Sequence, residues 1–275
     1  MTTSFDVNRV NWDDRAAIHL ADKAGSYRVA EFLAGGDTLH DIEHDEIGDV
    51  RGLRIAHLQC HFGLDTLSLA RRGASCVGLD FSPVAIAGAR DLQRRTGLDA
   101  RFVEGNVYDA PALLDGDFDR VYVTWGAINW LPDMAAWARV VAALLKPGGR
   151  LYLLEGHPAL LTLDEYSEKL NPAHDWRTPP DRPIVMAEDT SYTGDEDRIA
   201  HPETHEWIHP LSTIITAVIE AGLKLDWLHE HELLAWQFSP LMVKVEEGLR
   251  RPLWRLPDGF PRLPLAFSLA ATRTG

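Results

Sequence analysis

The sequence lacks the features that mark secreted and membrane-spanning proteins. Cysteine occurs only at Cys60 and Cys76 among 275 residues, too few for a disulfide framework, and this favours a reduced, cytosolic protein. The longest purely apolar run, residues 140–145, falls far short of the roughly 20 residues that a membrane helix needs. The start of the chain, MTTSFDVNRV, has neither the basic nor the apolar region of a secretory signal, so we expect none.

Positive charge is also scarce. Lys and Arg total 27 against 41 Asp and Glu, which gives a formal net charge of −14. Such a surface repels phosphate backbones, and no basic run offsets it, so nucleic acid and anionic membranes are poor partners. With 45% hydrophobic and 25% charged residues the composition is that of a globular protein, and the length predicts one core domain with elaborations.

Apolar strands and helices alternate regularly through residues 51–156. The expected strands cover residues 53–58, 76–80, 100–104, 118–125 and 150–155. The expected helices cover residues 64–72, 82–96 and 133–145. Ser82-Pro83 supplies an N-cap and a first-turn proline for the second of these helices, and Gly97 ends it. This alternation predicts an α/β fold with a doubly wound parallel sheet and right-handed crossovers.

The flanking segments predict additions to this sheet. Helical spacing is seen at residues 11–24 and 26–34 before it and at residues 212–221 after it. Residues 157–209 are irregular and rich in proline. Strands expected at residues 224–229 and 264–271 come late enough to form an antiparallel edge, with a short helix expected between them at residues 241–249. We interpret the acidic run at residues 37–46 as a solvated face.

The carboxyl ends of the expected strands carry polar groups that suit a nucleoside. In a doubly wound sheet the ligand binds at these ends, near the reversal of strand order. The turn HLQCHFG, residues 57–63, follows the first strand, and Asp80 ends the second. A carboxylate there can accept hydrogen bonds from both hydroxyls of a ribose. Asn106-Val107 follows the third strand and offers an amide for the edge of an adenine and an apolar side chain for its face.

Together with FDRVYV in the fourth strand and the turn LKPGG before the fifth, this order resembles the class I S-adenosylmethionine-dependent methyltransferases. The resemblance is strong over residues 51–156 and extends more weakly over nearly the whole chain. It implies a Rossmann-like sheet of about seven strands with the last antiparallel. It also implies S-adenosylmethionine as cofactor and S-adenosylhomocysteine as product. The implied division of the chain is an N-terminal helical lid at 1–50, a cofactor-binding core at 51–156, a substrate cap at 157–209 and completion of the core sheet at 210–275. The cofactor contacts implied by the resemblance are Gln59, His61, Gly63, Asp80, Phe81, Asn106, Val107 and Thr124.

The first turn departs from the family pattern. His57 stands where the family usually has an acidic residue, and Gln59 and His61 stand at two glycine positions. Glycine adopts positive φ freely and these residues do not. Either the backbone path differs, or the side chains of Gln59 and His61 themselves contact the methionine part. A dinucleotide cofactor is disfavoured, because Gln59 and His61 interrupt the G-x-G-x-x-G turn that a pyrophosphate needs.

Several further residues are candidates for chemistry. His157 follows the fifth strand, and Pro158 biases it towards an extended pose in which it could take a proton from the acceptor. Glu155 is a second catalytic candidate, and a structural role is the alternative for both. We expect no metal, because His57, Cys60 and His61 sit inside the cofactor turn. Proline interrupts the repeat formed by His201, His205 and His209, which reads as a polar loop or strand edge.

Tryptophan is plentiful, with nine residues. Aromatic walls favour planar or apolar acceptors and can stabilise a sulfonium by cation–π attraction, while core packing is the alternative for each ring. The candidates for substrate contact are Trp12, Tyr27, Trp125, Trp130 and Trp207. The sequence therefore predicts methyl transfer by in-line displacement to an aromatic or secondary-metabolite-like small molecule. It leaves open a non-catalytic S-adenosylmethionine-binding regulatory protein, a protein-directed methyltransferase, the acceptor atom, and whether the chain is a monomer or a homodimer.

Overall fold

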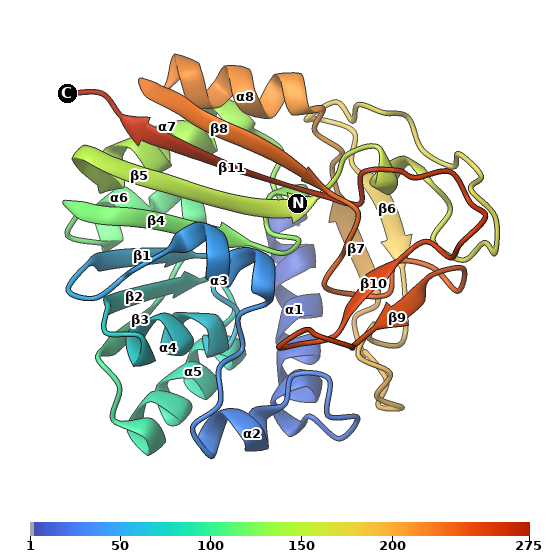
Figure 1. Cartoon of the computed structure of the whole chain (residues 1–275), viewed down its shortest axis with the longest axis horizontal. Helices are drawn as coiled ribbons and strands as arrows, with labels where there is room; N and C mark the ends of the chain where they lie inside the picture. The colour runs from blue at the N-terminus through green and yellow to red at the C-terminus, as the bar shows by residue number, and fades with distance from the viewer. Residues whose placement is uncertain (1–2) are drawn as a thin grey trace.

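A seven-stranded sheet forms the centre of the computed structural model, which describes residues 3–275 (Figure 1). The strand order is β3-β2-β1-β4-β5-β11-β8. The strands are β1 (Arg54–Leu58), β2 (Ser75–Asp80), β3 (Ala100–Glu104), β4 (Phe118–Thr124), β5 (Leu145–Gly156), β8 (Leu223–His231) and β11 (Ala266–Arg273). The first five pair in parallel, and β11 is antiparallel to both of its neighbours. The expected α/β sheet with a final antiparallel strand is confirmed.

Helices cover both faces of the sheet because alternate strand residues point to opposite sides. Val121 and Val123 of β4 pack with α7 (Met134–Leu144) and α8 (Leu211–Glu220), whereas Tyr122 between them belongs to the cluster on the other face. The remaining helices after β1 are α4 (Leu64–Arg71), α5 (Pro83–Thr96) and the short α6 (Ala110–Leu113). In α5 the hydroxyl of Ser82 accepts a hydrogen bond from Ala85 N, and Gly97 ends the helix with a left-handed φ of 63°, as predicted.

The N-terminal region differs from the expectation. Helix α1 (Ser4–Ala21) begins seven residues earlier than expected, because Thr3 and Asp6 form a reciprocal capping box. Helix α2 (Val29–Leu33) is short, so Tyr27 lies in the loop before it. The acidic run is not a solvated face: it forms α3 (Asp41–Ile47), in which Glu43 is fully buried and accepts a hydrogen bond from the hydroxyl of Tyr122. Leu39 and Ile47 anchor this helix on the sheet and turn Glu43 inward.

Helix α1 and two small sheets lie at the edge where the parallel strands end (Figure 1). Strand β6 (Ile184–Ala187) pairs with β7 (Glu203–Glu206), which confirms the strand-edge interpretation of the segment around His205. Strand β9 (Val243–Val245) pairs with β10 (Leu253–Arg255). The helix expected at 241–249 was wrong, since Gly248 takes a left-handed φ of 77° and the chain turns back as a hairpin.

Hydrogen bonds join α1 to the segment 157–209. The side-chain amide of Asn8 donates to His205 O and accepts from His205 N, both at 2.8 Å. Asn11 donates to His201 O at 2.7 Å. The lid and the cap therefore form one layer over the strand ends. Within residues 3–275, no helix has the length and apolar character needed to cross a membrane.

Gly63 begins α4 with a left-handed φ of 77°, and a Cβ added there would lie 2.6 Å from Cζ of Phe102. We expect Gly63→Ala to lower the free energy of unfolding by roughly 2–4 kcal/mol, from left-handed strain plus overpacking. The matched control is Gly97→Ala: Gly97 has a φ of 63° and nothing within 4 Å of the added atom. It should cost only about 1 kcal/mol in urea unfolding. Equal costs for the two variants would show that contact with Phe102 is unimportant.

Candidate functional site

The turn after β1 takes left-handed backbone conformations at Gly63 and at two residues that are not glycine. Gln59, His61 and Gly63 have φ values of 56°, 53° and 77°, all in the left-handed region. Such conformations cost non-glycine residues of the order of 1–3 kcal/mol and persist where the surroundings impose them. The turn thus takes backbone conformations that glycine adopts freely, with the side chains of Gln59 and His61 present. Contact of these side chains with the cofactor stays a prediction.

Asp80 at the end of β2 holds this turn in place. One carboxylate oxygen accepts a hydrogen bond from His61 N at 2.8 Å, and the other accepts from Ser82 N at 2.9 Å. A carboxylate has about four lone-pair sites, so acceptor capacity remains on both oxygens. Burial raises the pKa of Asp80 to about 6. The group is therefore an acceptor whose charge is sensitive to mild acid.

Gln59 bridges β1 and β4, the neighbouring strands between which the strand order reverses. Its Nε2 donates to Ala127 O at 2.6 Å. Its Oε1 is buried and receives no hydrogen bond from residues 3–275. A buried acceptor left without a donor is costly, so Oε1 marks a place for a ligand N–H or O–H group.

The other residues expected to contact the cofactor follow strands β2, β3 and β4, and they differ in how deeply they are buried. Asn106 begins a short 3-10 helix, and its side-chain oxygen accepts from Tyr108 N at 3.0 Å. Val107 is buried in the main core cluster, so its packing role is clear and its contact with a ligand stays a prediction. Thr124 is buried at the end of β4, and Phe81 is half-buried beside Asp80.

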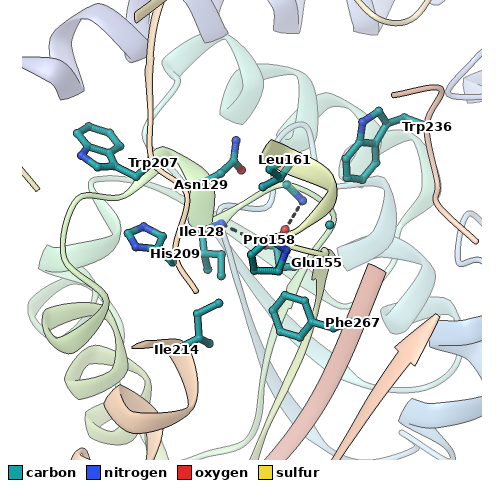
Figure 2. Close-up of a pocket in the computed structure, with 12 residues that line it drawn as sticks. Ile128, Asn129, Glu155, Pro158, Leu161, Trp207, His209, Ile214, Trp236 and Phe267 are labelled. Atoms are coloured by element: carbon teal, nitrogen blue, oxygen red, sulfur yellow. Dashed lines mark hydrogen bonds between the residues drawn. The ribbon is translucent and has the colours of Figure 1, made fainter. Parts of the chain in front are cut away.

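Glu155 near the end of β5 organises the loop that follows β4. Its carboxylate accepts hydrogen bonds from Gly126 N, Ala127 N and Ile128 N, the last two at 2.8 and 3.1 Å. Figure 2 shows Glu155 beside Ile128 in the wall of a pocket. Burial raises its pKa to about 7, while these backbone donors favour the ionised form. The structure thus shows Glu155 fixing a loop; a catalytic role for it stays a prediction.

Two adjoining pockets lie at this edge of the sheet. The strand-end pocket, shown in Figure 2, is lined by residues that include Ile128, Glu155, Pro158, His209, Trp236 and Phe267. The cap pocket is lined by residues that include Glu165, His174, Met186, Glu206, Ile208 and Phe238. Asn129, Leu161 and Trp207 line both. Because Trp236 and Phe238 come from the segment between β8 and β11, the cover is not confined to residues 157–209.

Of the predicted catalytic and substrate residues, Glu155 and Trp207 line these pockets, whereas His157, Trp12, Tyr27, Trp125 and Trp130 do not. His157 lies with Nε2 3.1 Å from Glu230 Oε1, and its Nδ1 accepts from Ala159 N at 3.1 Å. Both ring nitrogens are engaged away from the strand-end pocket, so the expected role as proton acceptor is not supported. Trp125 packs on His40 and Trp236, with ring centroids 5.7 and 6.2 Å apart, and lines neither pocket.

Aromatic side chains from the N-terminal segment pack over the turn after β1. Trp12 packs edge-on against both His61 and Trp130, with centroid distances of 5.3 Å. Nδ1 of His19 lies 3.3 Å from Nε2 of His61. Burial lowers the pKa of both histidines, that of His19 to about 3, so the pair is neutral at physiological pH. Tyr27 packs on Phe62 at 4.9 Å, at the side of the same cluster.

The sequence analysis missed the polar stripe of α1. Asn8, Asn11, Arg15 and His19 recur at helical spacing and are all buried. Arg15 reaches Glu188 of the cap at 3.3 Å, and His19 Nε2 lies 2.6 Å from Ser191 Oγ. The signal was available, because polar residues three and four apart occupy one helix face. Their partners in the cap could not be read from any local pattern.

The comparisons agree with the fold. Residues 55–149 match the sequence model of a methyltransferase domain. Over these residues the chain is similar to methyltransferase domains, in agreement with its resemblance to the class I S-adenosylmethionine-dependent methyltransferases.

Particular relatives match part of the chain. A ubiquinone biosynthesis O-methyltransferase of Xanthomonas euvesicatoria is 33% identical over 130 residues, covering 45% of this chain and 54% of the relative. A 23S rRNA (uracil(1939)-C(5))-methyltransferase of Nitrosospira multiformis is 36% identical over 123 residues, covering 42% of this chain and 26% of the relative. The chain thus spans about half the length, or less, of these curated relatives.

Solved structures share the fold over most of the chain. An S-adenosylmethionine-dependent methyltransferase of Clostridium acetobutylicum has a TM-score of 0.56 at 15% identity, covering 90% of this chain and 92% of that chain. A Listeria monocytogenes structure described as a methyltransferase of the same kind has a TM-score of 0.54 at 17% identity, covering 83% and 94%. At these identities the likeness extends to the fold alone.

The buried ionisable groups predict a loss of stability above about pH 6.5. Burial raises the pKa of Glu43 to about 8 and of Glu155 to about 7, so the native state releases these protons less readily than the unfolded chain. Stability should therefore fall as pH rises from about 6.5 to 8, by about 1–2 kcal/mol. Burial lowers the pKa of His40 and His57 from 6.5 to about 3, so below 6.5 these histidines take up protons only in the unfolded chain and oppose the effect of the two carboxyls, which begins at about 4.5.

Urea unfolding at stepped pH should show stability falling between about pH 6.5 and 8, a range in which these histidines are neutral in both states and the two carboxyls are ionised more fully in the unfolded chain. The exposed control Asp115→Asn should leave the profile unchanged, because the Asp115 side chain is 79% exposed. Stability that rises steadily from about pH 6.5 to 8 would contradict the assignment of these raised carboxyl pKa values.

Proposed function

We propose that this protein transfers a methyl group from S-adenosylmethionine to a small-molecule acceptor bound in the strand-end pocket. The supporting observation is the position of that pocket. It lies at the carboxyl edge of β4 and β5, and Gly126, Ile128 and Asn129 of its wall belong to the loop that Gln59 of the cofactor turn contacts. An acceptor held there lies next to the proposed cofactor cradle.

The residues present fit the cofactor. Asp80 retains acceptor capacity for ribose hydroxyls, and the unpartnered Oε1 of Gln59 suits a donor on the methionine part. Asn106 and Thr124 supply further polar groups at the ends of β3 and β4. When bound, S-adenosylmethionine supplies an electrophilic methyl group on a sulfonium. The aromatic faces of Trp12 and Trp130 attract such a cation without forming an ion pair with it.

The chain's own contribution is alignment and exclusion of water. Glu155 fixes the loop 126–129 by three backbone hydrogen bonds, and Trp207 N bonds to Asn129 O at 2.8 Å, which joins the cap to the same loop. Holding acceptor and donor at close contact on rigid elements removes much of the entropic barrier to an in-line displacement. We assign no general base, since His157 faces Glu230.

A small acceptor is favoured over a macromolecule. The net charge of −14 opposes binding of RNA, so the rRNA named for one relative is not carried over to this chain. The pocket is also roofed by Trp207 and Trp236 from segments that cover the strand ends. A reduced, cytosolic setting and the absence of a metal remain predictions from the sequence.

The test combines binding with product detection. Calorimetry should show one S-adenosylhomocysteine bound per chain, and mass spectrometry should show a mass gain of one methylene on an acceptor from a small-molecule panel with S-adenosylmethionine. A denatured sample controls for uncatalysed methylation. Absence of S-adenosylhomocysteine binding would refute the function. Binding with no product across the panel would favour a non-catalytic S-adenosylmethionine-binding protein.

Asp80 should make cofactor binding sensitive to acid. Its pKa of about 6 means that lowering the pH from about 7 to 5 protonates the acceptor of the ribose hydroxyls, so affinity for S-adenosylhomocysteine should fall over that range. Asp80→Asn turns an amide N–H towards one of two backbone donors and should weaken binding about tenfold or more, with this pH step lost. The exposed control Asp91→Asn should bind normally. An unchanged pH step in Asp80→Asn would contradict the ribose assignment.

Gln59→Gly separates folding from binding. The variant relieves left-handed strain of about 1 kcal/mol and loses the bond to Ala127 O, worth about as much, so the melting temperature should change little. Affinity for S-adenosylhomocysteine should fall about tenfold, because a buried acceptor is removed. Native affinity in this variant would show that Oε1 faces no part of the cofactor.

A further inference from the structure

The cap pocket has an acidic end. Glu165 and Glu206 line it, and the negative charge of Glu188 raises the pKa of both carboxyl groups. The guanidinium of Arg15 lowers the pKa of both, and it already pairs with Glu188 at 3.3 Å. Three carboxylates thus share one guanidinium.

Neutral donors do not remove this excess of negative charge. Asn129 Nδ2 and Thr204 Oγ1 each donate to Glu206 at 3.2 Å, and the hydroxyl of Tyr166 donates to Glu188. Burial and the two neighbouring carboxylates raise the pKa of Glu165 to about 7. Carboxylates withdrawn from water need a cationic partner to stay ionised at low cost.

Apart from His174 and Asn129 the rest of the pocket is apolar, and it adjoins the strand-end pocket. Trp207, Met186 and Phe238 line it, so an aromatic or aliphatic body fits between them. It shares Asn129, Leu161 and Trp207 with the strand-end pocket. Asn129 Oδ1 is buried at this junction and receives no hydrogen bond within residues 3–275, so a second independent feature awaits a donor group.

We propose that the methyl acceptor carries a protonated amino group, which faces Glu165 and Glu206 in the cap pocket while the atom to be methylated lies in the strand-end pocket. This acceptor class rests on the proposed function and names the substrate of the same site. The Asn129 oxygen at the junction accepts an N–H or O–H of the bound molecule. The amino group anchors the molecule and takes no part in the bond change.

Three probes of similar shape and different charge test the class. Tyramine is cationic, 4-ethylphenol is neutral and 4-hydroxyphenylacetate is anionic. Calorimetry is run at about pH 7.5 on the protein saturated with S-adenosylhomocysteine. Tyramine should bind at least tenfold more tightly than 4-ethylphenol, and 4-hydroxyphenylacetate more weakly than either, as expected for a charge-assisted contact. Equal affinities, or no tyramine binding, would overturn the proposal.

Variants locate the charge recognition. Glu206→Gln and Glu165→Gln should each lower tyramine affinity about tenfold and change 4-ethylphenol affinity less than twofold. Glu203→Gln is the matched control, since Glu203 lies on the same strand β7 with a side chain 59% exposed and outside the pocket. Native tyramine affinity in both pocket variants would refute the assignment.

Binding of S-adenosylhomocysteine separates this inference from the proposed function. Each variant is first shown to bind S-adenosylhomocysteine with native affinity, which also establishes that it folds. If the native protein does not bind S-adenosylhomocysteine, the proposed function fails. If it binds S-adenosylhomocysteine and shows no preference for the amine, only the acceptor class fails.

Discussion

The carboxylate of Glu155 holding the backbone of residues 126–128 is the interaction on which the rest of the site depends. In that loop, Ala127 O accepts a hydrogen bond from the side-chain amide of Gln59 in the turn after β1. From the cap the loop receives Trp207 N at Asn129 O, and His209 Nε2 lies 2.7 Å from Leu131 O. Core turn, β4 loop and cap are thus positioned by one buried acid. Because a buried charge removed from its donors is costly, the loop has little freedom to take another shape.

The lid is joined to this arrangement by a different kind of contact. The inward face of α1 is polar, and Asn8 and Asn11 bond to the backbone of the cap. Hydrogen bonds of this kind specify geometry, and exchange with water makes their net contribution modest. The rings of Trp12 and Trp130 supply apolar contact over the cofactor turn. Hydrogen bonds thus fix α1 on the cap, while apolar contacts of Ala16 and Leu20 join it to the core.

The core could be predicted from the sequence because its signals are local. Strand β3 has the expected bounds, and Ser82 and Gly97 delimit α5 as their residue types indicate. The errors have a common cause: the deciding contact is distant in the chain. Glu43 is buried because Tyr122 lies opposite it, and the pairing of β9 with β10 overrides the helical pattern of 241–249. The partners of His157 and Arg15 likewise come from strand β8 and the cap, which no spacing rule reveals.

The acidic character that argues against nucleic acid as a partner also favours cationic ligands at the site. Asp80, Glu155 and Glu165 are all withdrawn from water around the strand ends, and burial raises the pKa of each to about 6 or 7. Such groups stay ionised best beside a cation, and S-adenosylmethionine is itself a sulfonium. A negative field from a chain of net charge −14 also concentrates cationic ligands near the surface. In the proposed reaction, methyl transfer would remove the sulfonium charge from the cofactor, whereas the proposed amino group in the cap pocket would keep its own charge. The acceptor would then hold its position as the electrostatics of the neighbouring cofactor site change.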